Sequence, residues 1–152
     1  MGEMWYPMEL IMDARCSNKH ILTSEALLSE WIRSLCNLIG MTPVGPVYME
    51  SFPFPGSTEK AISACQFLGE SGIIVHPYPE FDFIYINVFS CRDFDALKAV
   101  RFIKNTLKIT ESTTYLFQRG INMETRAPVK LIPTLPFEEG KERMTTGLRR
   151  SG

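Results

Sequence analysis

Apolar residues recur every three or four positions in two segments of the chain, which is the spacing that places them on one face of an α-helix. The first segment covers residues 27–39, and Thr23 or Ser24 before it can act as the N-cap. The second covers residues 94–107, follows Asp93 as a candidate N-cap, and carries Lys and Arg between its apolar positions. The sequence therefore predicts two amphipathic helices.

Runs rich in β-branched and aromatic residues, separated by Gly, Pro and polar clusters, predict strands in the rest of the chain. They are expected at residues 8–14, 47–52, 62–68, 72–75, 81–89 and 112–118. Strands interleaved with two long helices predict an α+β fold, a two-layer sandwich of a mainly antiparallel sheet with both helices on one face. The other sheet face then needs cover, and a second copy of the chain is the expected partner in a homodimer.

Length and composition fit one globular domain. The chain has 152 residues, of which 45% are hydrophobic and 22% charged, with a net charge of −1. We expect a single domain over residues 1–137 and a flexible tail over residues 138–152, where few residues could enter a core. The near-neutral charge argues against nucleic-acid binding. The short apolar runs and the lack of a basic leader argue against a membrane span or secretion, so a cytoplasmic protein is expected.

Cysteine and histidine spacing gives no sign of a metal site. The four cysteines include no C-x-x-C pair, and the chain has only two histidines. We therefore expect no metal, take Cys16, Cys36 and Cys65 as packing residues and His20 as a solvated loop residue, and read the free thiols as typical of a reducing compartment.

Candidate chemistry is concentrated between residues 63 and 91. A hydroxyl at Ser71, an imidazole at His76, a carboxylate at Glu80 and a thiol at Cys91 fall within one strand-rich region. These residues do not form a G-x-S-x-G motif, so serine hydrolysis has no support. Three of them also have a structural reading: Ser71 as a turn residue, His76 as a strand-end histidine bonded to a carbonyl, and Cys91 as a core thiol.

The same residues resemble the small prokaryotic S-adenosylmethionine decarboxylases, which are pyruvoyl-dependent enzymes of polyamine and spermidine synthesis. The motif of that family, E-S-x-x-x-x-H-x-x-P-E followed by a strand ending in Phe-Thr-Cys, is matched by Glu70-Ser71, His76, Pro79-Glu80 and Phe89-Ser90-Cys91. The upstream serine of the family, eight residues before the cleaved one, is matched by Ser63, and its first strand by LIMDARC at residues 10–16. The resemblance covers residues 8–118.

The resemblance implies that the chain is a proenzyme that cuts itself between Glu70 and Ser71. The hydroxyl of Ser71 would attack the carbonyl of Glu70, and Ser63 would help to stabilise the resulting oxyanion. His76 would then remove the α-proton of residue 71, and the remnant of Ser71 would become a covalent pyruvoyl group.

The resemblance also implies the roles of the remaining residues. The pyruvoyl ketone would form a Schiff base with S-adenosylmethionine and accept electrons as carbon dioxide leaves, without a metal or an external cofactor. Cys91 would deliver a proton to the substrate α-carbon. Glu80 would bind the substrate. Phe52 and Phe54 are candidates for stacking on adenine, although simple packing fits them equally.

Three departures from the family pattern leave alternatives open. Gly72 stands where the family has His, and Pro77-Tyr78 stands where it has Thr-Trp or Thr-Tyr. Before Ser63, residues 57–62 replace the short G-V-S link of the family. The same scaffold could therefore decarboxylate a basic amino acid such as ornithine or arginine. A third reading is an uncleaved, non-catalytic regulatory homologue that pairs with an active partner.

Overall fold

The computed structural model describes residues 7–122, 124–128 and 132–134. Seven strands form one sheet in the order β2-β3-β4-β5-β1-β6-β7, and every neighbouring pair is antiparallel. The strands are β1 (Met8–Cys16), β2 (Pro43–Pro53), β3 (Lys60–Leu68), β4 (Ser71–Tyr78), β5 (Phe83–Ser90), β6 (Ile109–Gln118) and β7 (Ile132–Thr134). The segment after residue 137, where a tail was expected, lies outside the described residues.

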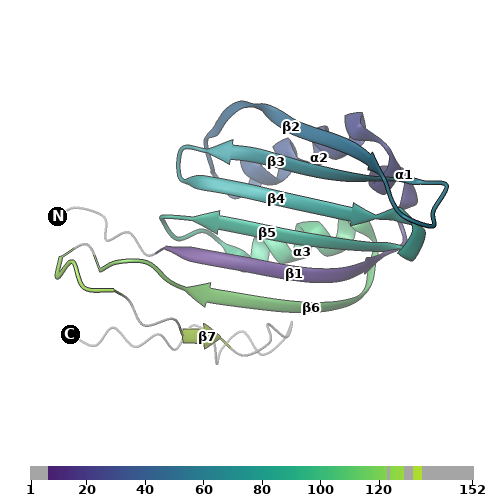
Figure 1. The fold of residues 1–152 in the computed structure, drawn as a ribbon. Coiled ribbons are helices and arrows are strands. Elements are labelled where there is room, and N and C mark those ends of the chain that lie inside the picture. The colour runs from purple at the N-terminus through teal and green to yellow at the C-terminus, as the bar shows by residue number, and fades with distance from the viewer. Residues whose placement is uncertain (1–6, 123, 129–131, 135–152) are drawn as a thin grey trace.

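Helices cover one face of this sheet (Figure 1). They are α1 (Lys19–Thr23), α2 (Glu25–Leu38) and α3 (Ala96–Leu107), with a 3-10 turn, η1, at Pro79–Phe81. The predicted α+β fold with two main helices on one face is confirmed. The short helix α1 was not predicted, because its five residues are too few to show a helical period.

Alternation along the strands explains which face is covered. In β1, Leu10, Met12 and Ala14 are fully buried under the helices, and the residues between them point to the other side. The helices contribute Leu28, Ile32, Leu35, Val100, Ile103 and Leu107 to the same core. Where α2 and α3 meet, the Trp31 ring stacks on Phe102 at 6.0 Å, and its Nε1 donates to Thr106 Oγ1 at 2.7 Å.

Several predicted strand boundaries were wrong. Strands β2 and β6 begin earlier than expected, at Pro43 and Ile109, and two further differences involve β4 and β5. Strand β4 continues through Pro77 to Tyr78 rather than ending at Val75. A proline is tolerated there because the pairing of β3 with β4 stops at Ala64↔Val75, so Pro77 has no strand partner on the β3 side, while β4 still pairs with β5 at Pro77↔Ile84. Strand β5 begins at Phe83 rather than at residue 81, because Phe81 is the last residue of η1 and Asp82, which follows it with a φ of +52°, turns the chain.

One predicted helix cap was also wrong. Helix α3 is capped by Asp95, whose Oδ1 accepts a hydrogen bond from the Lys98 N–H at 2.9 Å, and not by Asp93. Of the two candidate caps for α2, the structure uses Ser24, whose Oγ accepts from Leu27 N–H at 3.2 Å. Gly40 follows this helix with a φ of +67°, a conformation that favours glycine.

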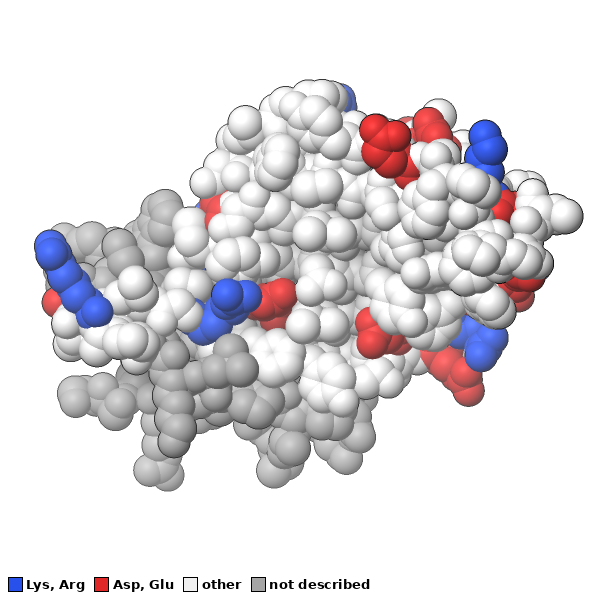
Figure 2. All heavy atoms as spheres, in the orientation of Figure 1, with Lys and Arg blue, Asp and Glu red and all other residues white. Residues whose placement is uncertain are grey.

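None of the described helices covers the other face of the sheet (Figure 1), and we call it the open face. The pairing registers place one row of side chains directly across it, Tyr48–Cys65–Ile74–Asn87–Ile11–Tyr115. Ile74 and Tyr48 are more than half exposed. Figure 2 shows this face, which is uncharged across its upper centre, while charged side chains gather at one end and a few lie within its lower part. Among the described residues, the helices are all too short or too polar to cross a membrane.

Candidate active site

The Glu70–Ser71 peptide lies at the turn between β3 and β4. Leu68 pairs with Ser71, so Gly69 and Glu70 form a two-residue hairpin turn. Gly69 donates its N–H to the Thr42 carbonyl at 2.9 Å, which fixes the turn against the start of β2. Ser71 has a φ of +155°, which L-residues rarely adopt. The backbone is therefore in an unfavourable conformation next to the predicted scissile bond.

The carbonyl of Glu70 accepts a hydrogen bond from the backbone N–H of Cys91 at 2.8 Å. This contact arises because β4 and β5 pair at Ser71↔Ser90, which places Cys91 just beyond the end of β5 and beside the turn. A donor on this oxygen withdraws electron density from the carbonyl carbon and can stabilise a developing oxyanion. The structure thus brings together the two residues of the predicted cleavage site and Cys91.

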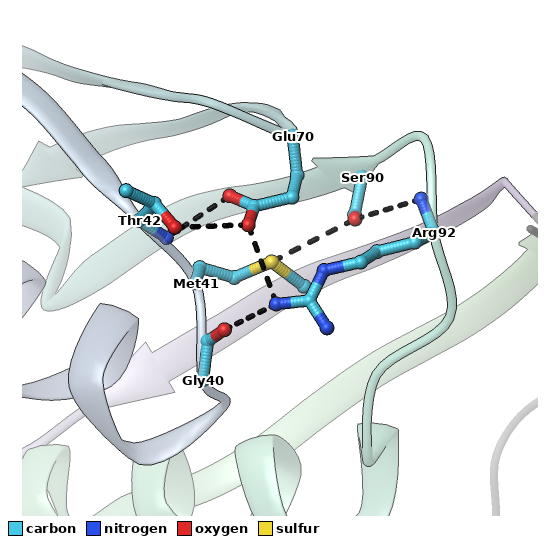
Figure 3. A network of polar contacts seen from close by, with 6 residues as sticks. All are labelled: Gly40, Met41, Thr42, Glu70, Ser90 and Arg92. Atoms are coloured by element: carbon cyan, nitrogen blue, oxygen red, sulfur yellow. Dashed lines mark hydrogen bonds and ion pairs between the residues drawn. The ribbon is translucent and has the colours of Figure 1, made fainter. Parts of the chain in front are cut away.

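The side-chain carboxylate of Glu70 has its own partners, different from that of the main-chain carbonyl (Figure 3). It accepts hydrogen bonds from Thr42 N–H at 3.0 Å and Thr42 Oγ1 at 3.1 Å, and it pairs with Arg92 Nη2 at 3.3 Å. Burial raises the pKa of Glu70, but the hydrogen bonds, including those from Thr42 and Arg92, outweigh burial and hold the pKa below its ordinary value. The side chain is ionised and fixed.

Ser63 and His76 form a pair on the open face. Ser63 Oγ lies 2.7 Å from His76 Nδ1, on the adjacent strands β3 and β4. Desolvation lowers the pKa of His76, and a hydrogen bond with the Ile62 backbone offsets it in part. Phe52 stacks on the imidazole at 5.9 Å, and Tyr78 packs edge-on at 4.5 Å. The imidazole is therefore a neutral base candidate, partly shielded by aromatic rings.

Within one chain, the Ser63–His76 pair lies far from the Glu70–Ser71 turn. Ser71 and His76 are separated by five residues of β4, which corresponds to about 16 Å at roughly 3.3 Å per residue. The structure therefore brings Ser63 and His76 together, and Glu70, Ser71 and Cys91 together, but it does not join the two sets in one protomer.

The three candidate substrate-binding residues lie around the Ser63–His76 end. Phe52 contacts His76, while Phe54 packs edge-on against Tyr78 at 5.5 Å and Phe81 at 5.9 Å. Glu80 belongs to η1, is exposed, and lines a small pocket with Phe54 and Tyr78. Aromatic faces and a carboxylate are thus available to a ligand near His76.

Sequence reasoning missed Arg92 and Thr42. Arg92 follows the candidate thiol directly, so its charge beside Cys91 was a usable signal. Thr42 gave no signal, because its contact with Glu70 joins segments 28 residues apart. In the part of the chain that the structure describes, no cluster of three or more His, Cys, Asp or Glu side chains could hold a metal ion. Cys16 and Cys36 are free and buried, and burial raises the pKa of the Cys36 thiol to about 11.

The fold and site define a two-layer α+β protein with a Glu-Ser hairpin turn and a Ser–His pair on an open sheet face. The family model described as S-adenosylmethionine decarboxylase matches residues 8–120. The chain therefore belongs to the S-adenosylmethionine decarboxylase family, as the motif spacing predicted.

A solved structure described as the adenosylmethionine decarboxylase from Aquifex aeolicus VF5 is similar to this chain. It is 17% identical, with a TM-score of 0.64, and the match covers 80% of this chain and 97% of that one. At this identity the likeness concerns the fold alone. No curated protein sequence matches the chain.

Proposed function

We propose that this chain is a self-processing, pyruvoyl-dependent S-adenosylmethionine decarboxylase of the cytoplasm. The observation that carries the proposal is the Glu70–Ser71 turn, in which an unfavourable backbone conformation adjoins a carbonyl that already accepts the Cys91 N–H. Family membership supplies the reaction class. Four cysteines without a disulfide among them fit a reducing compartment.

Self-cleavage starts when Ser71 Oγ attacks the Glu70 carbonyl carbon. The Glu70–Ser71 amide bond breaks, an ester to Ser71 Oγ forms, and the amide nitrogen becomes a free amine. Relief of the φ of +155° favours this exchange, because the chain is released from a conformation that costs about 1–3 kcal/mol. The Cys91 N–H stabilises the oxyanion on Glu70, a role that we expect Ser63 to share.

His76 completes the cleavage. As a neutral imidazole it takes the α-proton of residue 71, and the bond from Cβ to the ester oxygen breaks, so that Glu70 leaves as a carboxylate. The resulting enamine tautomerises, and water replaces its nitrogen, which leaves as ammonia. The products are a small chain of residues 1–70 and a large chain that begins with a pyruvoyl group made from Ser71.

The turn between β3 and β4 would hold this pyruvoyl group, which would supply a ketone that accepts electrons when carbon dioxide leaves the substrate. The Cys91 thiol, at the end of β5 beside the turn, delivers a proton to the substrate α-carbon. Delivery to the pyruvoyl carbon instead would inactivate the enzyme, so the position of this thiol matters. Phe52, Phe54 and Glu80 bind the substrate.

A homodimer resolves the separation of the two halves of the site. On the open face, the rows through Gly72 and through His76 lie two residues on either side of the Ile74 row. A two-fold axis running along the Ile74 row, between two packed faces, would place the His76 row of one copy opposite the Gly72 row of the other. Each active site would then combine Ser63 and His76 of one protomer with Glu70, Ser71 and Cys91 of its partner.

Intact mass under denaturing conditions tests the proposal. We expect freshly purified protein to give two chains split between residues 70 and 71, the larger with an N-terminal pyruvoyl group. The Ser71→Ala variant lacks the nucleophile and should remain one chain of about 17 kDa without decarboxylase activity. A Ser71→Ala protein that still decarboxylates would overturn the proposal.

Substrate assays separate the proposed reaction from its alternatives. The cleaved protein should release carbon dioxide from S-adenosylmethionine. Release from ornithine or arginine alone would instead show that the altered flank of His76, Pro77-Tyr78, accompanies a change of substrate. A wild-type chain that remains uncut, and is inactive by itself, would fit a regulatory homologue.

A further inference from the structure

Arg92 is a charged residue at the cleavage site that the proposed chemistry does not use. It directly follows Cys91, and its guanidinium reaches back across the turn between β3 and β4 (Figure 3). Nη2 pairs with Glu70 Oε1 at 3.3 Å and also donates to the carbonyl of Gly40. The backbone N–H of Arg92 donates to Ser90 Oγ at 3.1 Å, so the base of the side chain is fixed as well.

These contacts hold Glu70 at both ends. The carboxylate is bound by Thr42 and Arg92, and the main-chain carbonyl is bound by the Cys91 N–H. The Glu70 side chain is only 11% exposed, so water competes little for these donors. With the charge-assisted contact to Arg92 at the carboxylate and the Cys91 N–H at the carbonyl, Glu70 is restrained at two points, which limits rotation of its peptide group.

We propose that Arg92 is a positioning residue for self-cleavage, which acts by anchoring the Glu70 carboxylate so that its carbonyl stays aligned for attack by Ser71. This inference rests on the proposed function. Its physical basis is that a misplacement of about 1 Å between reacting groups can reduce a rate by about 100-fold. Arg92 itself touches neither the scissile carbonyl nor the Ser71 hydroxyl in the contacts described.

The same contacts link the two products of the cut. Thr42 and Gly40 belong to the small chain of residues 1–70, and Arg92 belongs to the large chain. Cleavage also leaves a second carboxylate on Glu70, where the carbonyl was bound by Cys91. A guanidinium offers five N–H donors, so Arg92 can neutralise this new charge and hold the end of the small chain beside the pyruvoyl group.

The test compares cleavage rates of the full-length protein, measured by intact mass after synthesis of the uncut chain. We expect Arg92→Ala to slow cleavage at least 10-fold, and Arg92→Lys to restore part of the rate because it keeps the charge but loses the fork geometry. The matched control is Lys19→Ala, which removes the ion pair between Lys19 Nζ and Asp82 Oδ1, 2.9 Å apart, away from this turn. It should cleave at the wild-type rate.

Hydroxylamine, which cleaves esters, identifies the blocked step. Uncut Arg92→Ala should resist it, because the amide has not become an ester. Uncut His76→Ala should be cut by it, because its block follows ester formation. If hydroxylamine cuts both variants alike, Arg92 does not act on the attack step, and the inference is wrong.

Glu70→Gln keeps the shape of the side chain and tests the pairing even if Arg92→Ala fails to fold. We expect it to slow cleavage, and we expect the double variant with Arg92→Ala to be no slower than the slower single variant. Independent, multiplying effects would overturn the pairing. If the wild-type chain cuts itself, and Arg92→Ala and Glu70→Gln both do so at the wild-type rate, this inference alone is overturned. A wild-type chain that never cuts overturns both this inference and the proposed function.

Discussion

The local surroundings of His76 suit the role of base that we propose for it. Its ring lies between Phe52 and Tyr78 and against Ser63 Oγ, so it is partly removed from water while one nitrogen keeps a polar partner. Burial lowers the pKa of His76 from its ordinary value of about 6.5. The neutral form, which can accept a proton, therefore dominates at neutral pH.

This pKa direction predicts the pH dependence of self-cleavage. The rate should be constant around pH 7 and should fall only below pH 6.5, as the pH drops through the lowered pKa and the imidazole becomes protonated. His76→Ala should lose about 10²- to 10⁴-fold in cleavage rate, the usual contribution of a general base. Intact mass measured against time across this pH range gives the rates.

The matched control uses the other histidine of the chain. His20 is exposed on α1, so His20→Ala should leave both the rate and its pH profile unchanged. A profile that falls already above pH 7 would contradict the assignment of His76 as the base.

For helix α3, the sequence offers two candidate N-caps, and the tertiary structure decides which of them begins the helix. Asp93 and Asp95 both precede its apolar face and both suit an N-cap. The Ser90–Arg92 segment bonds to the turn at Glu70, which delays the start of the helix until Asp95. The helix thus begins where the chain is released from the candidate site.

Removal of the cap should destabilise the protein by a defined amount. Asp95→Ala deletes the acceptor for the Lys98 N–H and should lower the free energy of unfolding by about 1 kcal/mol. Asp93→Ala removes the same charge two residues earlier, outside the helix, and should change it by less than about 0.5 kcal/mol. Urea unfolding measures both variants, and equal losses would show that Asp95 does not act as the cap.

At the scale of the whole molecule, the open face exposes apolar side chains that the described part of a single chain does not cover. Its central row includes Ile74, 56% exposed, and neighbouring Phe67 on β3 is 55% exposed. Apolar side chains gathered on the uncovered face of a sheet are typical of an interface. The face also carries Ser63 and His76, so the proposed dimer interface would include two residues of the proposed site.

A charge in the middle of this face should separate the proposed dimer. Ile74→Asp places a carboxylate on the central row and should convert the dimer to monomers in sedimentation, because the charge would be buried without a partner. Leu27→Asp, at a 43% exposed position on α2 behind the sheet, makes the same chemical change away from the face and should remain dimeric. A monomeric wild-type protein that cleaves itself and decarboxylates would contradict the shared site.

Mixed dimers test whether the site is shared between protomers. Neither Ser71→Ala nor His76→Ala should cleave efficiently by itself. Co-produced in equal amounts, they form dimers in which His76 of the first variant meets Ser71 of the second, so about half of the His76→Ala chains should be cut. The Ser71→Ala chains should all remain intact. An absence of cleavage in the mixture would show that each site forms within one chain.

The sequence by itself determined the fold class, the two main helices, most strands and the family. These features follow from local periodicity and from fixed spacings, as in Glu70-Ser71, His76 and Cys91, which are written along the chain. It also identified Ser63 as a partner for this set, and the structure pairs it with His76 at 2.7 Å.

Only the tertiary structure decided which of these residues meet. Strand pairing set Ser63 beside His76 but placed Ser71 about 16 Å away along β4, because an extended strand cannot fold back within five residues. The contacts of Glu70 with Thr42 and with Arg92 join segments 28 and 22 residues apart, respectively. Periodicity carries no information about such contacts, because they depend on how the hairpins and the helix ends pack against one another.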